Sequence, residues 1–247
     1  MNGLIHKKHF MLVLLAILSV VLYGLDYILL GSIRELSVWF LGNLAFLPLY
    51  IIFVTLMVEQ IMRERERQNL MRKLNMVIGV FFSEVGNRLL RELSSCVVMG
   101  AELRGELRVS GQWGEADFQR ALAYLRSHDP QIDSSGHHRQ LLKDFLIARR
   151  GFLVGLLENQ SLLEHEQFTD LLWAVFHLLE ELDARDSLDE MTTADREHLN
   201  GDIKRAFGYL SREWVFYMRH LKEDYPYLFS LAVRMNPMVE HPDPHVY

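Results

Sequence analysis

Two apolar stretches near the start of the chain decide its fold: residues 10–30 read FMLVLLAILSVVLYGLDYILL, and residues 38–62 read VWFLGNLAFLPLYIIFVTLMVEQIM. Each stretch matches the run of about 20 apolar residues that a helix needs to cross the hydrocarbon core of a bilayer. The connector between them, residues 31–37, is the short polar sequence GSIRELS, so the second helix must return antiparallel to the first. The sequence therefore predicts a transmembrane hairpin over residues 1–62, with spans at about 10–30 and 38–62.

Basic side chains flank this predicted hairpin on one side of the membrane. Lys7 and Lys8 precede the first span and five Lys or Arg residues lie within residues 63–73, whereas the connector has Arg34 beside Glu35. Because Lys and Arg near span ends are retained in the cytoplasm, both termini are expected on the cytoplasmic side of a bacterial inner membrane. A cleaved signal peptide is disfavoured, because the first run is too long, no small-x-small cleavage site follows it, and a second span comes at once.

The distribution of charge separates the predicted membrane part from the rest. Of the 26 basic and 32 acidic side chains in the chain, 8 and 5 lie within residues 1–73, which leaves 18 basic and 27 acidic residues beyond that point. Such an acidic part would be repelled by phosphate backbones, so nucleic-acid binding is disfavoured. The expected partners are the lipid bilayer, other membrane or cytoplasmic proteins, and a second copy of the chain in a homo-oligomer. The single cysteine, Cys96, excludes an internal disulfide, as a reducing cytoplasm would lead one to expect.

Beyond the spans, every firm sequence pattern is helical, which predicts an all-α fold: the transmembrane hairpin followed by a cytoplasmic helical bundle. Residues 63–93 contain no proline and are expected to continue the second span as a juxtamembrane helical linker. Residues 94–235 are expected to form the cytoplasmic all-α domain, and residues 236–247 a disordered tail. Within the domain, residues 94–114 are glycine-rich and predict a loop-rich connection. Four helices are expected after it: 115–127; a helix capped at 134–135 that runs through 158; a helix that opens with a capping box at 161–164 and runs through about 184; and 192 through about 223.

Gly79, Ser83 and Gly86 recur at spacings of four and three residues in the predicted juxtamembrane helix. Small residues at this spacing form a smooth stripe on which a second helix backbone can pack closely. Two interpretations stay open. In one, the stripe packs against the protein's own cytoplasmic domain; in the other, it is a dimer seam that relays movement from the membrane.

Three histidines are each followed four residues later by an acid: His177 by Glu181, His198 by Asp202, and His220 by Asp224. On a helix such a pair projects from one face and can supply two ligands to an iron or zinc ion. The segment 195–198, Asp-x-x-His, resembles the acid-x-x-His element of carboxylate-bridged di-iron bundles, and 177–181, His-x-x-x-Glu, resembles the corresponding element of hemerythrin-like bundles. Both resemblances cover a few residues, and neither ligand set is complete.

His177 is the strongest candidate ligand, because it lies in an almost wholly apolar helical segment. Asp170, two turns earlier on the same side, and Glu181, one turn later, complete a candidate metal site of Asp170, His177 and Glu181. The alternative is a core histidine held by a carboxylate without metal. His198 and Asp202 lie off the apolar stripe of their own helix, so they are expected to face solvent.

No phosphate-binding loop, dinucleotide-binding glycine motif, nucleophile elbow or Cys-x-x-Cys pair occurs in the chain. The sequence therefore favours a membrane-anchored interaction or signal-relay protein without catalysis of its own. The alternative is a membrane-tethered helical-bundle protein that binds iron or zinc and has redox or sensing activity.

Overall fold

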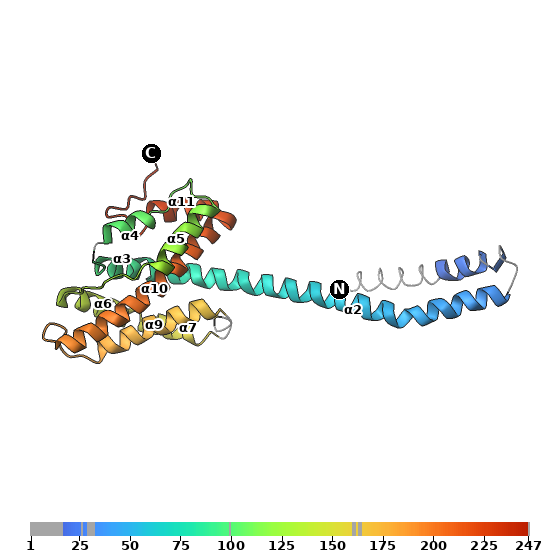
Figure 1. The fold of residues 1–247 in the computed structure, drawn as a ribbon, viewed down its shortest axis with the longest axis horizontal. Coiled ribbons are helices and arrows are strands. Elements are labelled where there is room, and N and C mark those ends of the chain that lie inside the picture. The colour runs from blue at the N-terminus through green and yellow to red at the C-terminus, as the bar shows by residue number, and fades with distance from the viewer. Residues whose placement is uncertain are drawn as a thin grey trace. The chain divides into compact units, whose positions relative to one another are not determined.

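The computed structural model describes residues 17–25, 27–28, 33–98, 100–159, 162 and 165–246. Within these ranges the chain is helical and forms no strand, apart from one isolated antiparallel bridge between Val97 and Ile132. The predicted all-α class is confirmed. The elements, in chain order, are α2 (Ile33–Phe81), the π-helical turn η1 (Phe82–Gly86), α3 (Asn87–Ser95), α4 (Gly100–Glu106), α5 (Glu115–Ser127), α6 (Gly136–Ala148), α7 (Arg150–Leu157), α9 (Glu166–Asp183), α10 (Thr193–Asp224) and α11 (Pro226–Arg234) (Figure 1).

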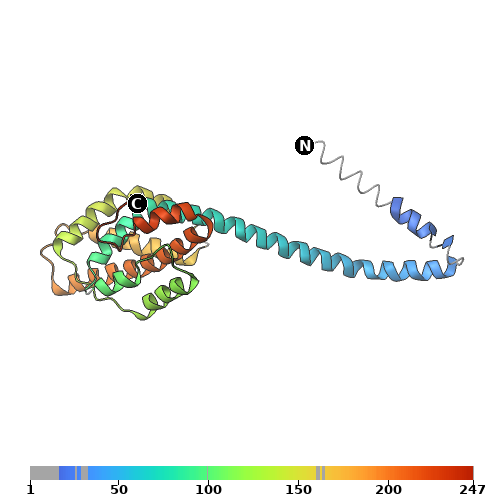
Figure 2. The ribbon, with the colours of Figure 1, turned by 90° about the horizontal axis from the view of Figure 1, so that it is seen from above.

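The chain divides into two units, Met1–Arg67 and Gln68–Tyr247. In the first unit the apolar part of α2 leaves its side chains exposed, and Trp39 and Phe53 each keep 67% of their surface accessible. One helix among the described residues is long and apolar enough to cross a membrane, and it contains the second predicted span. Helix α2 continues without a break through Pro48 to Phe81 (Figure 2).

The two-helix hairpin is not established by this structure, which supports one apolar helix of membrane-spanning length. Residues 31–32 of the predicted connector lie outside the described residues, and residues 33–37 begin α2. Of the first predicted span, residues 10–30, only residues 17–25 and 27–28 are described, and they are helical.

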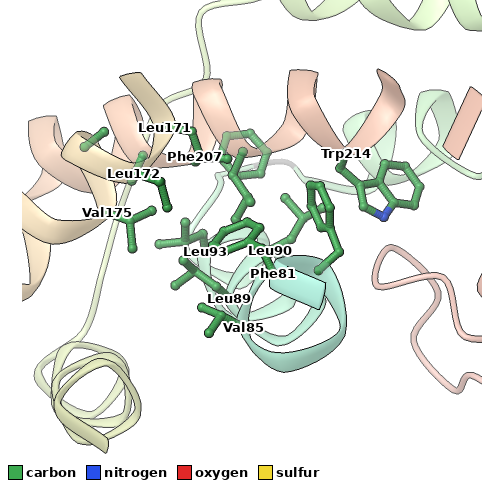
Figure 3. Close-up of a cluster of buried hydrophobic side chains, with 14 of the residues drawn as sticks. Phe81, Val85, Leu89, Leu90, Leu93, Leu171, Leu172, Val175, Phe207 and Trp214 are labelled. Carbon is green, nitrogen blue, oxygen red and sulfur yellow. The ribbon is translucent and has the colours of Figure 1, made fainter. Parts of the chain in front are cut away.

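The core of the second unit forms around α10, which packs against α9, α5, α11 and α3. Apolar side chains recur along α10 at three- and four-residue intervals, the spacing that keeps them on the buried side of a helix. Phe81, the last residue of α2, and Phe82, the first residue of the π-helical turn η1, are both fully buried. Figure 3 shows the centre of this core, with residues from α2, η1, α3, α9 and α10: Phe81, Val85, Leu89, Leu90, Leu93, Leu171, Leu172, Val175, Phe207 and Trp214.

Several predicted boundaries differ from the structure. The glycine-rich segment 94–114 contains the helix α4, and the helix predicted through residue 158 is divided at Arg149 into α6 and α7. Helix α9 begins at Glu166 after the cap His165, whose side chain accepts a hydrogen bond from the backbone N–H of Phe168. The predicted capping box at 161–164 lies largely outside the described residues.

Part of the predicted linker and the first residues of the predicted tail pack in the bundle. Leu74 and Ile78, within the predicted linker 63–93, are buried in the core of the second unit. At the start of the predicted disordered tail, Asn236 and Met238 are buried, and the Asn236 side-chain amide donates to the carbonyl of Leu107. The apolar Met238 and the buried hydrogen bond explain why the chain stays on the bundle beyond α11.

Candidate metal centre

Two consecutive helices, α9 and α10, bring two histidines and two carboxylates together. His177 and Glu181 lie one turn apart on α9, and His198 and Asp202 lie one turn apart on α10. The Thr192 hydroxyl caps the start of α10 by accepting from the backbone N–H of Asp195. Because the two helices pack side by side, the two pairs face each other, and one candidate ligand atom from each of the four residues lies within 4.8 Å of the others.

Each imidazole of this four-residue cluster faces both carboxylates through its Nε2 atom. From Asp202 Oδ2, the distance is 3.6 Å to His177 Nε2 and 3.4 Å to His198 Nε2. From Glu181, the distance is 3.8 Å to His177 Nε2 (Oε1) and 3.5 Å to His198 Nε2 (Oε2). These separations are too long for good hydrogen bonds. They are close to the roughly 3.4 Å that separates neighbouring ligand atoms around a tetrahedral zinc ion with bonds of about 2.0–2.1 Å.

Asp202 is the most deeply buried member of the cluster, with 2% of its side chain exposed. Its Oδ2 atom, the one aimed at both histidines, has no hydrogen-bond partner among the described residues. A buried carboxylate oxygen without a partner is costly, so such an atom indicates a missing positive charge or ligand. The histidine side chains are 45% and 54% exposed, which leaves the opposite side of the cluster open to solvent.

Two arginines hold the carboxylates from outside the cluster. Arg185 donates to Glu181 Oε2 at 2.7 Å and to Asp195 Oδ1 at 2.6 Å, and Arg205 donates to Asp202 Oδ1 at 2.8 Å. The hydrogen bond from Arg185, with further attraction from the guanidinium and the two histidines, lowers the pKa of Glu181. Arg185 lowers the pKa of Asp195 in the same way. Groups behind a ligand that fix its orientation and keep it ionised are a regular feature of metal sites.

The donor set of two imidazole nitrogens and two carboxylate oxygens suits a single divalent ion. Zinc accepts this combination in a tetrahedral site, and iron(II) accepts it with further positions filled by water. The open side formed by the two histidines would leave such an ion accessible to a small molecule.

The predicted site and the observed cluster share His177 and Glu181. Asp170 is exposed on α9 and is not among the four clustered residues. The expectation that Asp202 faces solvent is wrong, because Asp202 is buried under α9. The signal that could have found the cluster is the repeat of the same His-x-x-x-acid spacing on two neighbouring helices. The third such pair, His220 and Asp224, forms a separate ion pair with 2.9 Å between Nδ1 and Oδ2.

The small-residue stripe does not present one exposed face. A Cβ atom on Gly79 would lie 3.7 Å from the ring of Tyr217 on α10, and Gly86 is buried against Phe82. Ser83 is exposed. This placement agrees with the interpretation in which the stripe packs against the protein's own bundle.

Two family models match the chain. The one described as "Uncharacterized protein MJ1433, C-terminal helical domain" matches residues 70–234, and "MJ1433, N-terminal helical domain" matches residues 3–62. The chain is 37% identical over 235 residues to the uncharacterized protein MJ1433 of the archaeon Methanocaldococcus jannaschii, and the alignment covers 94% of each chain. No solved structure matches the chain.

Proposed function

We propose that this chain, which belongs to the MJ1433 family of helical proteins, is a membrane-anchored metal-binding protein. In this proposal it binds one divalent metal ion between α9 and α10. The ligands would be His177, Glu181, His198 and Asp202, and the ion zinc or iron(II). Asp170 is left out of the proposed ligand set because it lies outside the cluster.

The observation that carries this proposal is the unpartnered Oδ2 atom of Asp202, buried between two histidine Nε2 atoms. In a buried ion pair or hydrogen-bond network, each carboxylate oxygen that faces the interior normally accepts a hydrogen bond. Here Arg205 satisfies the outer Oδ1 atom of Asp202, and the inner Oδ2 atom points toward the candidate ligand atoms of the other three residues. A bound ion would join α9 to α10 and stabilise the folded state in proportion to its affinity. Because two ligands are half exposed, a sensing or redox role fits better than a purely structural one.

The membrane anchor is the second part of the proposal. Helix α2 supports it, because its apolar residues stay exposed over a length sufficient to cross a bilayer. The apolar run at 10–30 would supply the first span of a hairpin, and the basic residues at 7–8 and 63–73 would keep both termini in the cytoplasm. As the relative is archaeal, we propose a cytoplasmic membrane rather than a bacterial inner membrane in particular.

A second candidate function is signal relay without catalysis. The continuity of α2 favours it, since the helix that carries the predicted second span also contributes Leu74, Ile78 and Phe81 to the core of the bundle. A shift of that helix would have to be accommodated by the core around α10, because closely packed interiors move between discrete arrangements. The two functions are compatible, and metal content separates the first from a relay that needs no ion.

The experiment is metal analysis of the full chain purified in detergent. The protein is stripped with a chelator, loaded with Zn²⁺ or, without oxygen, with Fe²⁺, and passed through a desalting column. We expect about one ion per chain and a higher melting temperature for the loaded protein. Asp202→Asn and His198→Ala should lose the ion and the rise in melting temperature.

His220→Ala is the matched control, because it removes a histidine with an acid at the same spacing, outside the cluster. It should keep the ion. A wild-type chain that retains no more metal than Asp202→Asn would overturn the metal proposal, and a captured membrane partner that does not depend on metal would then favour the relay.

A further inference from the structure

A cavity separate from the proposed metal centre lies farther toward the C-terminal end of α10 and is lined by different residues. It has a volume of about 290 Å³, and its walls come from the last turns of α2, the start of α9 and the second half of α10. Its lining includes Asn75, His165, Glu213, Phe216, Tyr217 and His220.

Glu213 is the unusual group in this cavity. Glu213 is only 5% exposed. Its carboxyl group makes no hydrogen bond or ion pair among the described residues. It also borders a smaller cavity of about 150 Å³, where Arg126 and Arg212 lie without forming an ion pair to it; the Nε atom of Arg212 donates instead to the carbonyl of Gly208. The described residues therefore supply no counter-charge for this carboxyl group, although Glu213 is almost fully buried beside two cavities.

The basic groups around the larger cavity already have partners. Arg219 donates to Glu115 at 3.2 Å and lies 3.9 Å from Glu223, and His220 Nδ1 lies 2.9 Å from Asp224. His165 accepts a hydrogen bond through Nδ1 as the cap of α9, and burial lowers its pKa, so its ring is neutral. The charge left without a partner is therefore the carboxylate of Glu213.

We propose that this cavity binds a small organic monocation, an ammonium compound, with Glu213 as the counter-charge. The rings of Phe216 and Tyr217 line the same cavity and add apolar surface for the alkyl part of such a compound. Phe216 already lies under the Arg219 guanidinium, and Tyr217 stacks on Phe82. The Asn75 amide, whose nitrogen lies 3.3 Å from His220 Nδ1, adds a polar group to the wall. The volume is at the lower end of the range for ligand pockets, which suits a compact amine rather than a nucleotide. This site is independent of the metal centre and can be tested separately.

The test uses the full chain in detergent at pH 8, with butylammonium and choline as probes and with 1-butanol and 3,3-dimethyl-1-butanol as their uncharged counterparts. Binding is followed by titration calorimetry. The alkaline pH is chosen because burial raises the pKa of Glu213 to about 7. We expect saturable binding of at least one cation, with the matching alcohol weaker by about tenfold or more.

Two variants locate the binding site. Glu213→Gln should weaken the cation by about tenfold or more, while Glu223→Gln should not, because Glu223 lines the same cavity but already faces Arg219. Circular dichroism checks that both variants keep their helices. The proposal is overturned if neither cation binds, if the alcohols bind equally well, or if Glu213→Gln loses no more affinity than Glu223→Gln. Metal loading of the same samples shows whether the metal proposal stands or fails on its own.

Discussion

At the scale of single residues, the buried acid Glu213 makes the stability of the bundle depend on pH. Burial raises its pKa from 4.5 to about 7, so the folded state holds the proton more tightly than the unfolded state. The stabilisation from this group is complete below about pH 4.5, declines as the pH rises, and is lost above about pH 7. The loss amounts to about 3 kcal/mol, at about 1.4 kcal/mol per pKa unit.

Glu213→Gln should remove this dependence, because an amide does not ionise. We expect the variant to be more stable than the parent at pH 8 by about 1–3 kcal/mol and nearly equal to it at pH 4.5. The measurement is the difference in free energy of unfolding between the two proteins in detergent across this range. The difference cancels the other titrating groups, among them Glu223 and His220 on the cavity wall. A difference that stays constant with pH would contradict the assigned pKa.

At the scale of helices, the sequence predicts α10 well but not its surroundings. Its apolar stripe predicted one buried face, and the bounds were found almost as expected. In the structure α10 packs against neighbours on several sides, so Asp202, Ser211 and Glu213 are buried as well. The spacing of apolar residues along a helix predicts which face is buried. It does not predict whether other helices pack on the polar face and bury the polar side chains there. The burial of Asp202 and Glu213, on which the two proposals depend, was therefore not predicted, although Asp202, His177 and Glu181 were named as candidate ligands.

Gly79 in α2 and Gly86 in η1 belong to the same small-residue stripe, but alanine is expected to change stability differently at the two positions. A Cβ atom on Gly86 would lie 2.5 Å from the buried ring of Phe82, which itself stacks on Tyr217. Gly86→Ala should therefore destabilise the bundle by about 1–3 kcal/mol, because the ring cannot move without disturbing the core. Gly79→Ala meets Tyr217 at an ordinary 3.7 Å and should be neutral or stabilising by up to about 1 kcal/mol, since alanine favours helix.

Thermal unfolding of both alanine variants in detergent, beside the parent, measures this difference. A loss of stability in Gly79→Ala would contradict the prediction. A smaller particle on gel filtration would show that the stripe contacts a second copy of the chain.

At the scale of the whole molecule, the sequence predicts two spans and the described residues support one helix of sufficient length. Membrane-spanning helices bury their apolar side chains in lipid, so their number is independent of the packing inside the bundle. The position of the N-terminus settles it: a hairpin keeps residues 1–9 in the cytoplasm with the C-terminus, and a single span places them outside.

Single cysteines in a Cys96→Ala background test this topology, and the native Cys96 is itself buried with a raised pKa caused mainly by burial. In intact cells, a maleimide that cannot cross membranes should label Ser32→Cys, in the predicted connector, and should leave Asn2→Cys and Gln68→Cys unlabelled until the membrane is opened. Labelling of Asn2→Cys from outside, with Gln68→Cys protected, would show a single span and remove the hairpin. Labelling of Gln68→Cys from outside would reverse the orientation, and the acidic bundle, with its proposed metal and cation sites, would then have to work outside the cytoplasm.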